Sequence, residues 1–238
     1  MKKYFYFILC MLLIVCSNPS KDPLRKFVGS YRNYFNVKGK VIGNRSNDRY
    51  YSPNKIFSVG LVDLFGPGII VNDTFRKDFG KNPDHNYNVG TVSFMDDFRA
   101  FYRIDAFKLP EERDFSENQL QLLLDALMEY EMTLYRELDS NSKILYKNYL
   151  KINNKYIGYY ITYLANGSTY SINGNKLDVL RSSFIFIKNN FVYVLSNQYG
   201  DNDNYFNKIT LNNQIIKKIE KSLTKIYKTM EFSNKKCK

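Results

Sequence analysis

One histidine limits the catalytic chemistry that this chain of 238 residues can support. His85 is the only histidine and lies in the polar stretch Asn82-Pro83-Asp84-His85-Asn86. A Ser-His-Asp triad or a histidine-containing zinc site would have to be built around it. No Gly-x-Ser-x-Gly nucleophile motif accompanies it. We therefore interpret His85 as an exposed loop residue and predict no catalytic residue and no enzyme activity.

Acidic residues form two groups with the chemistry to hold a cation. Asp96 and Asp97 are adjacent, with Asp105 on the following segment, and paired carboxylates serve as acid and base or bind a metal. Residues 201–204 alternate oxygen side chains as calcium loops do, but lack the glycine and the distal glutamate of an EF-hand. Asp and Asn are also favoured turn residues. We therefore predict turns, with no metal site and no cofactor; a weak surface calcium site at residues 201–204 is the alternative.

The first residues predict export. Lys2 and Lys3 give a positively charged start, and residues 4–15 form an uninterrupted apolar segment of signal-peptide length. A membrane-spanning helix needs about 20 apolar residues. Here Cys16 is followed by polar residues and Pro19. These features favour a signal segment over a membrane span.

Residues 13–16, Leu-Ile-Val-Cys, resemble the lipobox of bacterial lipoproteins. The resemblance implies that Cys16 is lipidated, becomes the N-terminus and anchors the chain to a membrane of a bacterial cell envelope, on its periplasmic or surface side. Val15 stands where the motif favours Gly, Ala or Ser. The alternative is cleavage after Ser17, because Val15 and Ser17 are small enough for a small-residue cleavage site. That cleavage would release a secreted, soluble protein.

Composition predicts a single globular domain. Residues 1–15 are the signal peptide, 16–45 a polar tether, 46–232 the domain and 233–238 a basic tail. The domain has the size that builds one core, and 44% of the chain is hydrophobic. After removal of the signal only Cys16 and Cys237 remain, so no disulfide framework is expected.

A formal net charge of +12 raises the question of an anionic partner. The basic residues are scattered over the whole chain and accompany many Asn, Ile and Tyr, the residue set that an A/T-rich genome favours. Neither a zinc-finger spacing nor an aromatic-basic RNA-binding motif is present. We therefore predict no nucleic-acid partner.

Several segments have the alternation or the β-branched and aromatic content of strands. They cover residues 57–61, 89–95, 98–107, 144–152, 156–164, 177–187 and 191–196. Asp96-Asp97 and the Asn-rich runs at residues 153–155, 166–168, 173–175 and 189–190 predict tight turns. The last four segments are expected to form an antiparallel meander. Its tyrosines are interpreted as core and sheet surface, with a ligand groove as the alternative: Tyr156, Tyr159, Tyr160 and Tyr163.

Two segments have helical periodicity. Ser116 and Gln119 have the spacing of a capping box before a run with leucines at residues 120, 123, 124, 127, 134 and 138. Charged residues, Glu131 among them, mark the face that we predict to be exposed. A second helix is expected from about residue 212 to 230, with isoleucines inward and lysines outward. We interpret its lysine face as solvated; contact with anionic headgroups is the alternative.

This order of elements predicts an α+β fold in which helices flank a mostly antiparallel sheet of about six strands. The order resembles that of the PsbP-like α/β/α sandwich. Residues 51–59 are similar to the aromatic-x-Pro-x-x-x-Phe-x-Val start of many bacterial relatives. Residues 92–97, 158–161 and 191–195 extend the similarity, which covers residues 48–231.

The resemblance implies a non-enzymatic accessory or binding domain and transfers no active-site residue. We predict an envelope lipoprotein that binds or assembles with an unidentified envelope protein. An exported hydrolase or a weak calcium-dependent binding protein is the alternative. A hydrolase should bring His85 or the Asp96, Asp97 and Asp105 carboxylates into one cleft.

Overall fold

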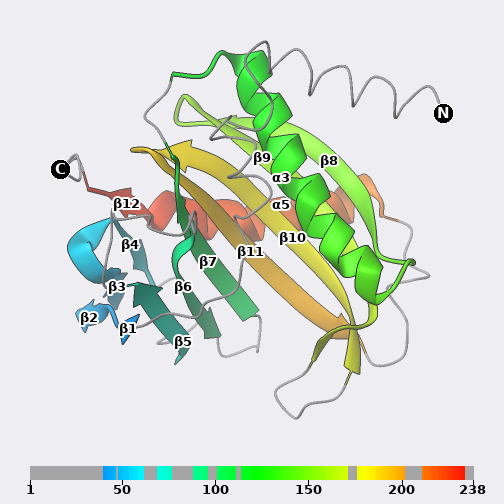
Figure 1. Ribbon diagram of the computed structural model, residues 1–238, viewed down its shortest axis with the longest axis horizontal. Coiled ribbons are helices and arrows are strands. Elements are labelled where there is room, and N and C mark those ends of the chain that lie inside the picture. The colour runs from blue at the N-terminus through cyan, green and yellow to red at the C-terminus, as the bar shows by residue number, and fades with distance from the viewer. Residues whose placement is uncertain are drawn as a thin grey trace.

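The computed structural model describes residues 40–46, 48–61, 69–76, 88–95, 101–110, 114–170, 176–201 and 211–233. These residues form two antiparallel sheets and two α-helices, α3 (Glu117–Leu138) and α5 (Asn213–Thr229). In Figure 1, α3 lies in front of the larger sheet and α5 lies behind it. The predicted α+β class and its antiparallel character are therefore confirmed.

The main sheet has eight strands rather than about six. Their spatial order is β1 (Lys40–Val41), β5 (Ile69–Arg76), β6 (Asn88–Met95), β7 (Phe101–Lys108), β11 (Phe191–Asp201), β10 (Lys176–Lys188), β9 (Lys155–Tyr170) and β8 (Lys143–Ile152). Every neighbouring pair is antiparallel. The predicted meander is present as β8 to β11, and α3 connects the centre of the sheet to its far edge.

A second sheet of four strands covers one end of the molecule. Its order is β12 (Glu231–Phe232), β4 (Phe57–Gly60), β3 (Arg49–Tyr51) and β2 (Asn44–Ser46), and a short 3-10 helix, η1 (Pro53–Lys55), joins β3 to β4. Residues 16–45 were assigned to the tether, but β1 and the start of β2 fall within that range. Their pairing shows that residues 40–41 and 44–45 belong to the two sheets.

Asparagine pairs form the hairpin turns of the meander. Asn153 and Asn154 join β8 to β9, and Asn189 and Asn190 join β10 to β11. All four have positive φ, between 51° and 63°. Asparagine tolerates this left-handed region, which both central residues of a type I′ turn require. The turns predicted at these two places are confirmed.

The turn predicted at residues 166–168 is wrong, because β9 continues through them to Tyr170. A register shift near Leu177 lets β9 and β10 continue pairing beyond it, with Thr169 opposite Leu177 and Tyr170 opposite Lys176. The Asn-Gly run therefore falls within an irregularity of the ladder, between Leu164 and Thr169, and not at the end of a strand.

The first helix begins as its sequence predicts. The Ser116 hydroxyl accepts a hydrogen bond from the Gln119 backbone N–H, and the Gln119 side chain accepts one from the Ser116 backbone N–H. This capping box satisfies two donors that a helix start leaves unpaired. Leu124 and Leu127 are fully buried against the sheet. Leu138 was predicted to lie on the buried face of this helix, but it is 66% exposed at the last turn of α3.

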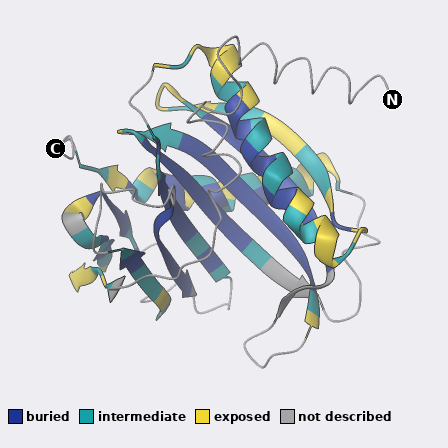
Figure 2. Ribbon diagram, viewed as in Figure 1, coloured by how far each residue is buried: buried dark blue, intermediate teal, exposed yellow. Residues whose placement is uncertain are grey.

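The two helices cover opposite faces of the main sheet. Residues of α3 pack with Tyr160, Val179 and Val192, whereas residues of α5 pack with the adjacent positions Tyr159 and Leu180. Successive strand residues point to opposite faces, so the alternation in the sequence creates two cores. Figure 2 shows the central strands buried along most of their length.

Candidate functional site

Most candidate residues lie outside the described residues. His85, Asp96, Asp97 and residues 202–204 belong to this group, as do Cys16 and Cys237. The predictions made for them therefore stay predictions. Among the residues that the structure describes, no three His, Cys, Asp or Glu side chains come together as a metal site. No helix in the same set is long and apolar enough to cross a membrane.

Asp105 is described, and its carboxylate is engaged. It lies on β7, is 1% exposed, and accepts hydrogen bonds from Arg103 Nε and Nη2 at 2.7–2.8 Å. Such a bidentate ion pair holds both partners in one geometry. This pairing favours a structural role for Asp105 over that of an acid or base.

The four tyrosines of β9 do not share one surface. Tyr159 points to the α5 side, where its hydroxyl donates to the Ile216 carbonyl at 3.0 Å. Tyr160 points to the α3 side and donates to Asp125 at 2.9 Å, and Tyr163 donates to the buried Asp178 at 3.0 Å. These contacts agree with the interpretation as core and sheet residues.

Asp125 ties α3 to the edge of the sheet. Its carboxylate accepts from Lys147 at 2.5 Å, Tyr149 at 2.5 Å and Tyr160 at 2.9 Å. Burial, followed by the Asp125 carboxylate, raises the pKa of Tyr160 far above its usual value, and the same causes raise that of Tyr149. Both phenols therefore stay protonated and donate to Asp125. This cluster fastens a helix and offers no activated group.

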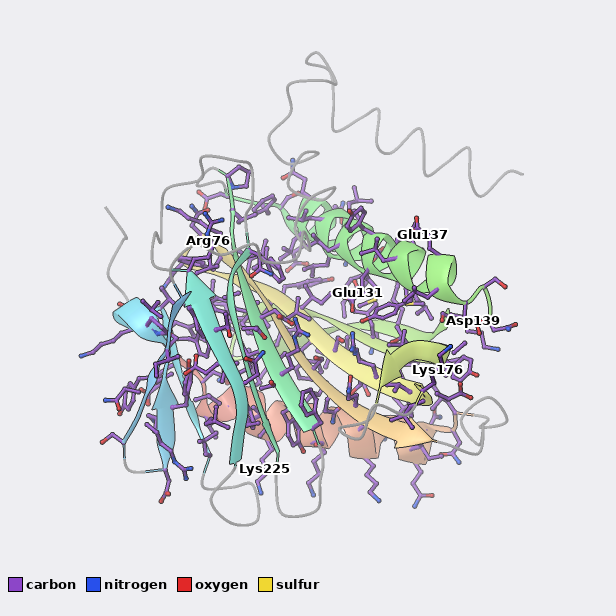
Figure 3. The ribbon with its side chains drawn as sticks, turned by 60° about the horizontal axis from the view of Figure 1, so that its bottom comes forward. Arg76, Glu131, Glu137, Asp139, Lys176 and Lys225 are labelled. Carbon is purple, nitrogen blue, oxygen red and sulfur yellow. The ribbon has the colours of Figure 1, made fainter. Side chains whose placement is uncertain are left out.

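Glu131 was predicted to be exposed, and this prediction is wrong. It is 2% exposed and forms an ion pair with Arg181 of β10 at 3.0 Å. Arg181 also donates to the Tyr135 hydroxyl at 2.5 Å and to Gln198 at 2.9 Å. Figure 3 shows Glu131 between α3 and the sheet and Glu137 on the outer side of the helix. A buried charge needs such a partner, and the partner is remote in sequence.

A pocket of about 200 Å³ lies at the end of the main sheet. Its walls come from the β8–β9 turn, the end of β10, the last turn of α5 and β12, and nine residues line it. Five of the nine are apolar or aromatic and form its floor, three are lysines and one is an asparagine. We call this site the lysine pocket; its residues are Asn153, Lys155, Phe186, Ile187, Lys188, Tyr227, Lys228, Met230 and Phe232.

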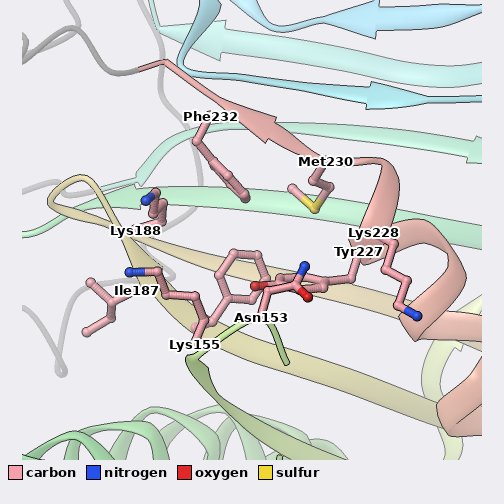
Figure 4. Close-up of a pocket in the computed structure, with 9 residues that line it drawn as sticks. Asn153, Lys155, Ile187, Lys188, Tyr227, Lys228, Met230 and Phe232 are labelled. Carbon is pink, nitrogen blue, oxygen red and sulfur yellow. The ribbon is translucent and has the colours of Figure 1, made fainter. Parts of the chain in front are cut away.

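The lysines flank the opening. Figure 4 shows Lys155 and Lys188 on one side and Lys228 on the other, with Asn153 between them. Lys155 follows the turn at Asn153-Asn154 and Lys188 precedes the turn at Asn189-Asn190. Both lysines therefore lie at the same end of the sheet's strands. Lys228 is in the last turn of α5, where a cation interacts favourably with the helix dipole.

The floor of the lysine pocket is aromatic. Phe186 and Tyr227 are 1% and 7% exposed, and their rings meet edge to face with centroids 5.0 Å apart. Phe232 meets Phe186 in the same way at 5.9 Å. Burial raises the pKa of Tyr227, so its phenol stays protonated at neutral pH. Ile187 and Met230 complete the apolar lining.

The positive charge of the pocket is not compensated from within the described part of the chain. No salt bridge there joins Lys155, Lys188 or Lys228 to a carboxylate. Glu231, the acidic residue nearest to Lys228 in the sequence, forms an ion pair with Arg49, with 3.1 Å between the guanidinium nitrogen and the carboxylate oxygen. Like charges around one hollow repel each other, and an anion would relieve that repulsion. The arrangement can bind an anion, and its nine lining residues include no Ser, Cys or His.

Sequence reasoning did not find this site, because its residues belong to elements far apart in the chain. The available signal was topological. In a meander of antiparallel strands, the first and third turns lie at the same end of the strands. Lysines beside both asparagine turns therefore had to come close.

Comparison with known proteins adds a structural similarity. No protein-family model matches the chain, and no curated protein matches it. Among solved structures, it is similar to the solution structure of cyanobacterial PsbP (CyanoP) from Synechocystis sp. PCC 6803. The TM-score is 0.44, with 9% sequence identity over 85% of this chain and 99% of that chain. A likeness at this level establishes neither family nor function, so the PsbP-like resemblance stays a prediction.

Proposed function

We propose that this chain is a non-enzymatic, exported lipoprotein of a bacterial cell envelope that acts as a binding module. The lysine pocket is the observation that supports a binding role. It combines uncompensated cations with an aromatic floor, the composition that holds an anionic ligand with an apolar part. Its ligand or partner is accordingly anionic.

The N-terminal residues support localisation to the cell envelope. Lys2, Lys3 and the apolar segment 4–15 have the form of a signal peptide, and Cys16 stands at the lipidated position of the lipobox it resembles. Lipidation at Cys16 would attach the domain, and the pocket with it, to a membrane of the envelope. A single acyl chain holds a protein only weakly, and more than one gives stable attachment.

The intact mass of the mature protein tests the proposed localisation. The full chain and a Cys16→Ser variant are expressed, and the membrane fractions are analysed by mass spectrometry. We expect a diacylglyceryl-modified chain that begins at Cys16, and its loss in the variant. An unmodified chain that begins after Ser17 would show that the protein is secreted without an anchor.

Thermal unfolding tests the binding role. A ligand that binds only the folded state raises the melting temperature. We expect millimolar aryl anions such as benzoate to raise the melting temperature of the full chain, and neutral benzyl alcohol to leave it unchanged. The Lys155→Gln/Lys188→Gln variant should lose the response to anions. Equal responses in both proteins would contradict an anion-binding pocket.

A further inference from the structure

The charge of the lysine pocket points to a ligand with more than one negative charge. Lys155, Lys188 and Lys228 line one hollow and give it three positive charges. A carboxylate or sulfonate contributes a single negative charge, whereas a phosphate monoester carries about −1.5 to −2 at pH 7. Of these three groups, the phosphate monoester therefore compensates the positive charge of the pocket best.

The residue types support the same ligand. The nine lining residues include no arginine and no carboxylate. Arginine recognises planar carboxylates and phosphates through two parallel hydrogen bonds, whereas lysine binds phosphate as a point charge with donors that turn freely, so a lining of lysines is compatible with a phosphate group. Lys155 and Lys228 are exposed and Lys188 is half-buried, so their side chains can follow a tetrahedral group from several directions.

The floor favours a ligand with an apolar body. Phe186, Tyr227 and Met230 line it at 1%, 7% and 8% exposure, and Phe232 lines it as a half-buried residue. Burying apolar surface contributes about 25 cal/mol per Å², which inorganic phosphate cannot supply. The pocket volume of about 200 Å³ is smaller than the roughly 300 Å³ at which sites for drug-sized ligands begin. The ligand is therefore small, or only its head enters.

The surroundings would attract such a ligand. Helix α5 carries five lysines and a single acidic residue, Glu220. Lys217, Lys218, Lys221 and Lys225 are exposed and continue from Lys228 along the helix, and Figure 3 shows Lys225 directed away from the sheet. A surface of one sign raises the local concentration of opposite charge and speeds association.

We propose that the lysine pocket binds a phosphate monoester attached to an apolar or aromatic body. The inference rests on the proposed binding function and names its ligand class. Two sources carry this group: a soluble aryl or alkyl phosphate, and the headgroup of a lipid such as phosphatidic acid. The lysines hold the phosphate in either case, and the aromatic floor receives the first part of the body.

Calorimetric titration of the full chain tests the ligand class. We expect phenyl phosphate to bind about tenfold more tightly than benzoate, benzenesulfonate or inorganic phosphate, a difference of about 1.4 kcal/mol. If benzoate binds as tightly as phenyl phosphate, the phosphate assignment is wrong and the anion-binding function stands. If none of these anions binds, both proposals are wrong.

Paired variants locate the binding. Lys155→Gln/Lys188→Gln removes two charges from the pocket and should weaken phenyl phosphate binding about tenfold. Lys217→Gln/Lys218→Gln removes two charges from the exposed start of α5, outside the pocket, and should change affinity less than threefold. Equal losses in the two pairs would overturn the proposal, because they would reflect net charge alone.

Vesicle sedimentation separates the two sources. The full chain is mixed with phosphatidylcholine vesicles that contain phosphatidic acid or, as a diester control of equal mole fraction, phosphatidylglycerol. A preference for phosphatidic acid that is lost in Lys155→Gln/Lys188→Gln assigns the site to a lipid headgroup. Phenyl phosphate binding without this preference assigns it to a soluble ligand. Absence of pocket-dependent binding in both arms overturns the proposal.

Discussion

The buried ion pair between Arg181 and Glu131 is expected to contribute strongly to the stability of the α3 face. Arg181→Met removes the cation and keeps most of the side-chain volume. It leaves Glu131, whose side chain is 3% exposed, without the partner at 3.0 Å. It also removes the hydrogen bonds that Arg181 donates to Tyr135 and Gln198.

The magnitude follows from these contacts. Breaking a buried ion pair by removing one partner costs about 3–5 kcal/mol, because the other charge stays buried. Methionine recovers part of the lost packing, so we expect the free energy of unfolding to fall by about 4 kcal/mol. Replacing both charges, as Arg181→Met with Glu131→Leu, should cost about 1 kcal/mol or less. The two substitutions are thus expected to be strongly non-additive.

Urea unfolding followed by far-ultraviolet circular dichroism measures all three variants. Glu129→Gln is the matched control, because Glu129 lies on the same helix in an ion pair with Arg136 but is 44% exposed. Exposed pairs contribute at most about 1 kcal/mol. The reasoning is refuted if Arg181→Met costs no more than the control, or if the double variant is as unstable as the sum of the single ones.

Two further predictions concern packing and pH. Gly90→Ala should lower the free energy of unfolding by about 1–3 kcal/mol, because its Cβ would lie 2.1 Å from a ring carbon of the fully buried Phe75. Gly60→Ala, whose Cβ would be 3.1 Å from its nearest neighbour, should cost less in the same urea assay, and equal costs would contradict this explanation. Burial, followed by a hydrogen-bonded carboxylate, raises the pKa of Tyr50, and burial and a nearby carboxylate raise that of Tyr160. The unfolded chain therefore loses these protons first, so stability should be complete below about pH 10 and decline as the pH rises above it. Urea midpoints between pH 8 and 11 measure this, and a flat profile would argue against raised pKa values.

Local signals in the sequence predicted much of the fold. The capping box at Ser116, the lysine and isoleucine stripes of α5 and the asparagine turns at residues 153–154 and 189–190 each depend on residues a few positions apart, and these are confirmed. Strand β5 was missed because Asn72 and Asp73 interrupt its apolar residues. Asp73 accepts a hydrogen bond from Tyr50, a partner 23 residues away. Local alternation contains no information about such a partner.

The error at Glu131 has a related cause. It follows Leu124 and Leu127 at helical spacing, so periodicity alone places it on the buried face of α3. Its charge argued for the exposed face, and the charge was given more weight. The compensating Arg181 lies 50 residues further along the chain. A buried charge can be predicted only together with its partner, and that pairing depends on the register of the meander against α3.

The lysine pocket was within reach of sequence reasoning only in part. The register that places Gly158 opposite Ile185 also brings the ends of β9 and β10 together at Lys155 and Lys188. A correctly predicted meander therefore implies two neighbouring lysines at one end of its strands. The other wall of the pocket depends on α5, which crosses the sheet on the face opposite α3 and ends beside those turns. The site therefore combines one wall that topology predicts with another that only tertiary packing provides.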